Sequence, residues 1–210
     1  MPLTINATEF EFGSATSVSG DHNNTGGKEL VCFLATPDAA GGAPSSVQYA
    51  GINMSAVEDR AVSNNVRVHI QKLSGALGGI NQMAAQYPGI SSGHMIAANW
   101  PNSRGILQST GGTQTVGTSG SLSTSAATTI GSKIYMSLVG AGTDAFTETT
   151  GATLLYSGDY STQVARLYEK DGTGGIVTFS WTFTFSARDL AFALVEIGHL
   201  IGGDQVILWS

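Results

Sequence analysis

The sequence predicts an all-β protein, a single antiparallel β-sandwich with jelly-roll-like connections. The clearest sign is a period of two over residues 176–185, where large apolar side chains alternate with Ser or Thr. Weaker alternation recurs in three other segments. The composition agrees, because 28 glycines and only 11% charged residues suit short strands joined by tight turns. The weaker segments are 9–12, 65–70 and 133–138.

The segment 176–185 is expected to be the central strand of the core. A strand places its alternate side chains on one face, whereas a helix would scatter the same aromatics around its circumference. Burying this face contributes on the order of 10 kcal/mol before the entropy cost is subtracted. The apolar positions are Val177, Phe179, Trp181, Phe183 and Phe185.

Short apolar runs and turn signals define further elements. Leu30–Leu34 and Thr153–Tyr156 are apolar at successive positions, which is typical of strands covered on both faces. Residues 47–54 predict a hairpin turning at Ala50-Gly51. Asp171-Gly172 predicts a second hairpin, just before the aromatic strand.

One apolar run, Leu190–Ile197, leaves two structures open. A strand is favoured, because the run follows the aromatic strand after only a few polar residues. A short helix is the alternative, since Ser186 and Asp189 have the spacing of a capping box.

No shift in composition divides the chain, so one domain is expected over residues 1–210. It begins with a short arm, about residues 1–7. Residues 108–129 are almost entirely Ser, Thr, Gly, Ala and Gln, and cannot bury enough apolar area for a core element. This segment is expected to be either a flexible loop or an extended strand pair at a sheet edge.

Charge and hydropathy argue against two classes of partner. The net charge is −6 and the nine Lys and Arg are dispersed, whereas nucleic-acid binding requires clustered cations. No apolar run approaches the roughly 20 residues that span a bilayer. The first residues lack the basic and apolar regions of a signal peptide, so synthesis in a cytoplasm is expected.

Candidate catalytic groups each have a simpler explanation. Glu9 and Glu11 project from one strand face, and glycosidases use such paired carboxylates, but Phe10 and Phe12 take the other face and leave the carboxylates in solvent. The four histidines lack metal-ligand spacing, and His69 is expected on an outer face. Residues 89–93 match Gly-x-Ser-x-Gly without the preceding strand that a nucleophile elbow requires. We therefore predict no enzyme, cofactor or metal site.

Three aromatic residues are candidate contacts for a partner or a glycan. Trp100 precedes a Pro-Asn turn, with Tyr87 nearby in sequence, so both are candidate stacking residues. A Trp100 that closes the core is the alternative. Trp209 ends an apolar run near the C-terminus, which indicates a strand tucked into the sheet or held for a neighbouring subunit.

The chain resembles the single-domain β-sandwich proteins of tailed-bacteriophage virions, of the head-decoration (cement) or tail-accessory type. The resemblance rests on residues 28–34 followed by the 47–54 hairpin, on the Ser/Thr/Gly-rich middle, and on 179–185 leading into 190–196. It implies a non-enzymatic structural protein of the virion that binds the major capsid protein or other virion subunits, and forms a homo-oligomer. The alternative is a carbohydrate- or receptor-binding sandwich of a tail or fibre.

Overall fold

The computed structural model of the chain describes residues 3–26, 29–38, 43–62, 66–116, 119–141, 147–160, 163–184 and 188–200. Every regular element in these ranges is a β-strand, and every strand pairing is antiparallel. These ranges contain no helix that is long and apolar enough to cross a membrane. The predicted all-β, antiparallel sandwich class is confirmed.

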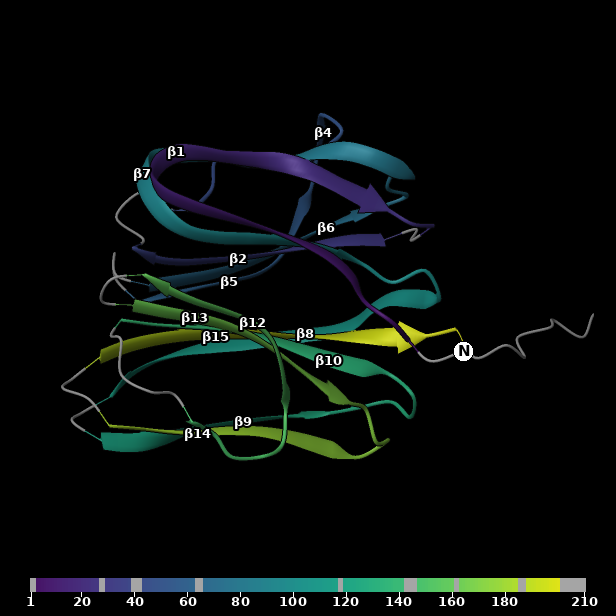
Figure 1. Ribbon diagram of the computed structural model, residues 1–210. Coiled ribbons are helices and arrows are strands. Elements are labelled where there is room, and N and C mark those ends of the chain that lie inside the picture. The colour runs from purple at the N-terminus through teal and green to yellow at the C-terminus, as the bar shows by residue number, and fades with distance from the viewer. Residues whose placement is uncertain are drawn as a thin grey trace, which may run out of the picture.

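Strands from the first half of the chain form one seven-stranded sheet, in the order β4-β3-β7-β2-β6-β5 with β1 on the free side of β7. It is the upper part of the molecule in Figure 1. Its strands are β1 (Asn6–Asn24), β2 (Glu29–Asp38), β3 (Ser46–Tyr49), β4 (Ile52–Asn53), β5 (Ser55–Val62), β6 (Val66–Ser74) and β7 (Gly79–Asn99).

The second half supplies two more sheets, stacked below the first (Figure 1). The middle sheet has five strands in the order β12-β13-β10-β15-β8, and the outer one three, in the order β11-β14-β9. The predicted sandwich thus carries a third sheet that the sequence did not predict. The strands are β8 (Ser103–Val116), β9 (Ser119–Ala127), β10 (Lys133–Ala141), β11 (Thr147–Glu148), β12 (Thr153–Tyr160), β13 (Gln163–Asp171), β14 (Ile176–Thr184) and β15 (Arg188–His199).

The seven-stranded sheet curls over its own core. β1 and β7 run together through a bend, where the pairing register shifts between Phe12 and Ser17. On the concave side the Phe10 ring covers Gly20, and a Cβ at Gly20 would lie 2.1 Å from that ring. The curl encloses an apolar cluster with contributions from β1, β2, β3 and β7.

Strands in the interior alternate between two cores. Leu30, Cys32 and Leu34 of β2 enter the cluster inside the curl, while Val31, Phe33 and Ala35 enter the cluster between the upper and middle sheets. This confirms that Leu30–Leu34 is covered on both faces. For Thr153–Tyr156 the same prediction is wrong, because β12 is an edge strand with two exposed leucines.

The middle sheet is also buried on both faces. Tyr135 and Val139 of β10 contact the upper core, and Ile134, Met136 and Leu138 contact the lower one. β15 alternates in the same way. The strand favoured for Leu190–Ile197 is therefore confirmed, and its double-sided hydrophobicity is what a central strand needs.

The aromatic strand is confirmed as β14, with the four described side chains of the alternating set buried; residue 185 lies outside the described ranges. Its predicted position at the centre of the core is wrong. β14 lies in the outer sheet and packs on the middle sheet by one face only. The physical reason is the alternation itself, because a row of hydroxyls on the second face requires a face open to water.

Two further predictions concern connections. Residues 47–54 do turn at Ala50-Gly51, with φ of 52° and 76°, as a tight hairpin needs. At Asp171-Gly172 the hairpin prediction is wrong, because β13 and β14 belong to different sheets. The segment 108–129 contains extended strands, β8 and β9. They pair with β15 and β14 rather than with each other.

The bend in β7 depends on Gly93. Its φ is +147°, and a Cβ there would lie 2.2 Å from the Ala35 carbonyl oxygen, which is fixed in β2. We expect Gly93→Ala to lower the free energy of unfolding by about 2–4 kcal/mol. Gly13 lies at the same bend with no atom within 4 Å of an added Cβ. Gly13→Ala is the matched control, with a change below about 1 kcal/mol in urea unfolding. Equal effects would contradict this explanation of the bend.

Candidate functional site

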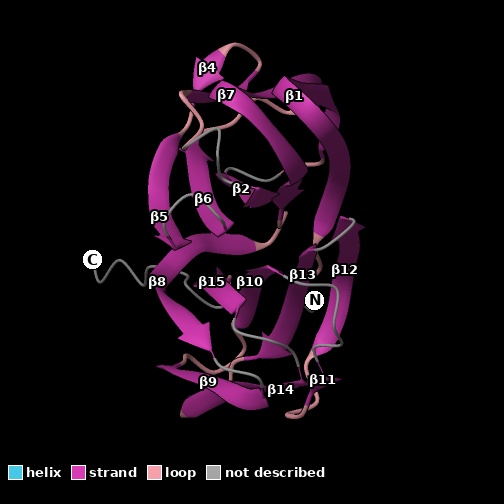
Figure 2. Cartoon of the chain, turned by 90° about the vertical axis from the view of Figure 1, so that its left-hand side faces the viewer, coloured by secondary structure: helices cyan, strands magenta, loops and turns pink. Residues whose placement is uncertain are grey.

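The two long sides of the sandwich differ. On one side β5 and β8 close the gap between the upper and middle sheets (Figure 2), and the Gly111 backbone packs so tightly on Arg60 that a Cβ would lie 2.8 Å from its Cγ. On the other side both sheets end in edge strands, β1 above β12. We call the space between β1 and β12 the open seam.

A groove of about 320 Å³ lies in the open seam. Its floor is apolar and buried, formed by Ile96 and Leu167, and Leu155 forms part of its wall. Its rim carries the more exposed residues of β1, including the carboxylate of Glu9. The full lining is Ile5, Ala7, Glu9, Ile96, Leu155, Tyr156 and Leu167.

Polar groups converge at the mouth of this groove. The Tyr156 hydroxyl donates a hydrogen bond of 3.0 Å to Glu11 Oε1 and so links the two sheets. Partial burial raises the pKa of Glu9, against the lowering effect of the Tyr156 hydroxyl, and the negative charge of Glu11 raises it further. The two carboxylates therefore share one small region of negative potential.

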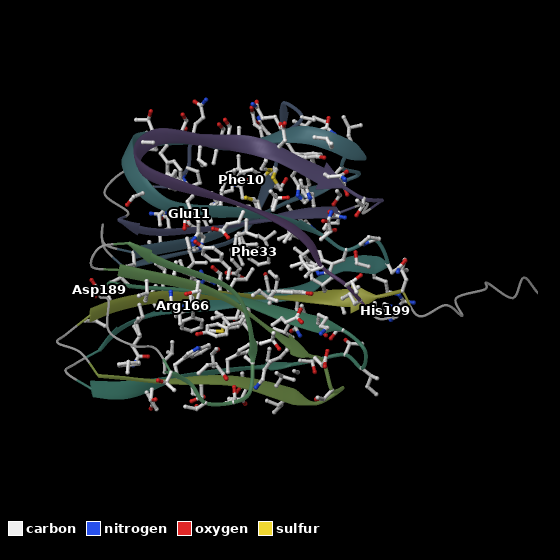
Figure 3. All side chains as sticks on the ribbon, viewed as in Figure 1. Phe10, Glu11, Phe33, Arg166, Asp189 and His199 are labelled. Atoms are coloured by element: carbon white, nitrogen blue, oxygen red, sulfur yellow. The ribbon has the colours of Figure 1, made fainter. Side chains whose placement is uncertain are left out.

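A buried histidine of the upper sheet packs against Tyr156. The His94 and Tyr156 rings meet edge to face, with centroids 4.1 Å apart. Burial, together with the positive charge of Arg166, lowers the pKa of His94 to about 3, so the imidazole is neutral at physiological pH. Arg166 pairs with Ser157 in the register, one position away from Tyr156, and its guanidinium donates to the carbonyls of Gly158 and Ala165. Figure 3 shows Glu11 and Arg166 on their separate sheets.

The rim of β12 is irregular and apolar. A bulge leaves Leu155 without a register partner on β13, between the paired residues Leu154 and Tyr156. Leu154 and Leu155 are 47% and 37% exposed. Among the described strands β12 pairs only with β13, so its outer row of backbone groups is available for another strand.

A second groove, of about 450 Å³, lies between the middle and outer sheets. Its two cations are already engaged by the protein. Lys133 Nζ lies 2.8 Å from Asp171 Oδ1 and 3.2 Å from Glu169 Oε1, and Lys170 Nζ donates to the Thr178 carbonyl at 2.8 Å. These contacts stabilise the ends of the sheets and leave the groove with balanced charge.

The structure does not bring the predicted contact residues together on a surface. Trp100 is in the core, where its Nε1–H donates to the Tyr135 hydroxyl at 2.7 Å. Tyr87 is also buried and stacks on Phe12, with centroids 5.4 Å apart. Neither ring presents a face to a glycan or a partner, so their predicted role is corrected to core packing. Trp209 lies outside the described residues.

The histidines also differ from expectation. His69 was expected on an outer face, but it is buried, with Nε2 2.7 Å from Gln71 Nε2 and Nδ1 3.4 Å from Asp59 Oδ1. His22 is buried between Thr8 and Asn99. No group of three or more His, Cys, Asp or Glu side chains that could hold a metal occurs in the described ranges.

The Glu9 and Glu11 pair is exposed, as the alternation predicted. Sequence reasoning missed that this exposed face borders a groove, because Tyr156 and Leu155 come from a strand about 145 residues later. A glycosidase places its two carboxyls on either side of the scissile bond. Here both come from one strand, on the same side of the groove.

No protein-family model matches the chain, and no curated protein does. Three solved structures resemble it slightly. The ANX2 ectodomain from Arabidopsis thaliana is 8% identical, with a TM-score of 0.28, over 92% of this chain and 83% of that one. The ANXUR1 extracellular domain from Arabidopsis thaliana is 8% identical, with a TM-score of 0.27, over 92% and 84%. The plant receptor-like kinase ANX1 is 9% identical, with a TM-score of 0.29, over 92% and 84%. Similarity at this level carries no argument about this chain.

The buried imidazole of His94, which contacts Tyr156 at the seam, predicts a pH dependence of stability. The folded pKa of His94 is about 3, against an ordinary value of 6.5, so between these values the unfolded chain binds a proton that the folded chain does not. Stability is therefore highest above pH 6.5 and falls as the pH is lowered toward 3. From pH 6.5 to 5 the loss due to His94 is about 2 kcal/mol.

His94→Gln should remove this loss from the pH dependence of the unfolding free energy, measured by urea unfolding between pH 7 and 5. The remaining slope is expected from His22, whose pKa is also lowered by burial. The measured quantity is the slope of the unfolding free energy against pH, so the test remains valid even if the variant is less stable than the wild type at every pH. An unchanged slope would show that His94 is not the neutral buried group described here.

Proposed function

We propose that this chain is a non-enzymatic structural protein of a virion, a decoration or cement subunit that binds the capsid surface. The observation that carries the proposal is the edge of β12 that no other described strand pairs with, with Leu154 and Leu155 exposed beside an apolar groove. An open sheet edge with exposed apolar side chains is a surface suited to contact with another subunit.

Strand addition supplies the binding energy in this proposal. The outer row of N–H and C=O groups on β12 pairs with an extended segment of a capsid subunit, and side chains beside it enter the groove. Decoration proteins of the type that the sequence resembles bridge capsid subunits, and several copies placed by the capsid symmetry would form a homo-oligomeric array.

The outer sheet supports the same proposal from the opposite end of the molecule. Hydroxyl side chains of β9 and β14 oppose one another in the register, as at Ser125 and Thr178, whose oxygens are 2.8 Å apart. Ser123 faces Ser180, and Ser121 faces Thr182. A hydroxyl-covered face is suited to water, so the subunit has an adhesive edge and a hydrated outer sheet.

We expect the purified chain to cosediment in a fixed stoichiometry with capsids of the phage whose genome encodes it. Leu154→Asp places a charge on the β12 edge and should weaken this binding at least tenfold, because the charge loses water in the contact. Ile52→Asp on β4 is the matched control, since Ile52 is 45% exposed at a different edge. It should bind like the wild type.

Absence of cosedimentation under any capsid maturation state would overturn the proposal. Equal loss from both aspartate variants would place the contact elsewhere. Circular dichroism and urea unfolding of each variant separate a lost contact from a lost fold.

A further inference from the structure

We propose that the open seam receives an extended segment of the partner that carries a long basic side chain, lysine or arginine, into the groove between β1 and β12. This inference rests on the proposed function and names the chemistry of the segment that docks. Three features of the seam support it, and each selects a different property of the occupant.

The free edges select an extended backbone. β1 pairs only with β7, and β12 only with β13, among the described strands, so two rows of unpaired backbone groups face the same seam. At the opposite side, β5 and β8 leave no such gap. A strand entering the open seam can therefore pair with one edge while its alternate side chains point toward the groove.

The groove selects a long side chain with an apolar stem. Ile96 and Leu167 form a buried floor, and Leu155 forms an exposed part of the wall. A volume of about 320 Å³ holds a single long side chain rather than a folded element. Lysine and arginine are the residues that bury an aliphatic stem and keep a charged group at the end of it.

The rim selects a positive charge. Glu9 lines the groove, and Glu11 is held beside it by the Tyr156 hydroxyl at 3.0 Å. Partial burial is the main cause of the raised pKa of Glu9, and the negative charge of Glu11 raises it further; a bound cation relieves that repulsion. The nearby cation, Arg166, donates to the carbonyl of Gly158 on β12 and to that of Ala165 on its own strand, β13.

The test uses two blocked nine-residue peptides of alternating threonine and valine, one with a central lysine and one with a central norleucine. Norleucine keeps the aliphatic stem and removes the charge. Affinities are measured at pH 7.5 by amide chemical-shift titration of the labelled full chain. We expect the lysine peptide to bind about tenfold more tightly, with shifts concentrated at residues 5–11 and 153–160, and the difference to shrink in high salt.

The double variant Glu9→Gln and Glu11→Gln should abolish the preference for lysine, because glutamine keeps the shape and the acceptor oxygen without the charge. Asp21→Asn is the control, since it removes one charge from the other half of β1 and should preserve the preference. Equal affinity for both peptides, no binding of either, or shifts confined to another edge would each overturn the inference.

The outcomes separate this inference from the proposed function. If the double variant still cosediments with capsids at wild-type stoichiometry and affinity, the decoration function stands and the basic segment is wrong. If the chain ignores capsids but prefers the lysine peptide, the groove chemistry stands and the capsid assignment is wrong.

Discussion

The fold depends on the burial of the middle sheet on both of its faces. β10 and β15 each send alternate side chains into two different cores, so neither face can be left to water. The upper sheet covers only one face of the middle sheet. A third sheet is therefore needed below the middle sheet to cover its other face. The outer strands are then free to be amphipathic, and β14 has the hydroxyl face that such a position allows.

Closure of the upper sheet accounts for the open seam. To enclose its own core, β1 must bend together with β7, and the bend requires the close backbone approach at Gly93. The first half of β1 is thereby placed as the last strand of its sheet, directly above another last strand, β12. Tyr156 spans the gap between them through its bond to Glu11. The groove is thus a by-product of curvature in one sheet and a bulge in the other.

Sequence patterns identified strands well and their layers poorly. The alternation at Val177–Phe183 fixes which side chains are buried, but it does not say whether the strand is central, and its hydroxyl face was the overlooked sign of an outer layer. The apolar run at Thr153–Tyr156 resembles that of β2, yet its bulge exposes two leucines. The environments of Trp100 and His69 depend on Tyr135 and Asp59, which sequence spacing does not connect.

The acidic rim also bears on self-association. Two copies that paired through their β1 edges in a symmetric contact would bring Glu9 and Glu11 against the same residues of the second copy. Like charges directly opposite in a sheet are destabilising, and charged side chains are a common means by which edge strands avoid pairing with copies of themselves. The seam is therefore an edge that resists another copy of this chain and attracts a cationic segment. Contacts between copies would then use other exposed apolar residues, such as Ile176 at the start of β14 and Ile130 in the turn after β9.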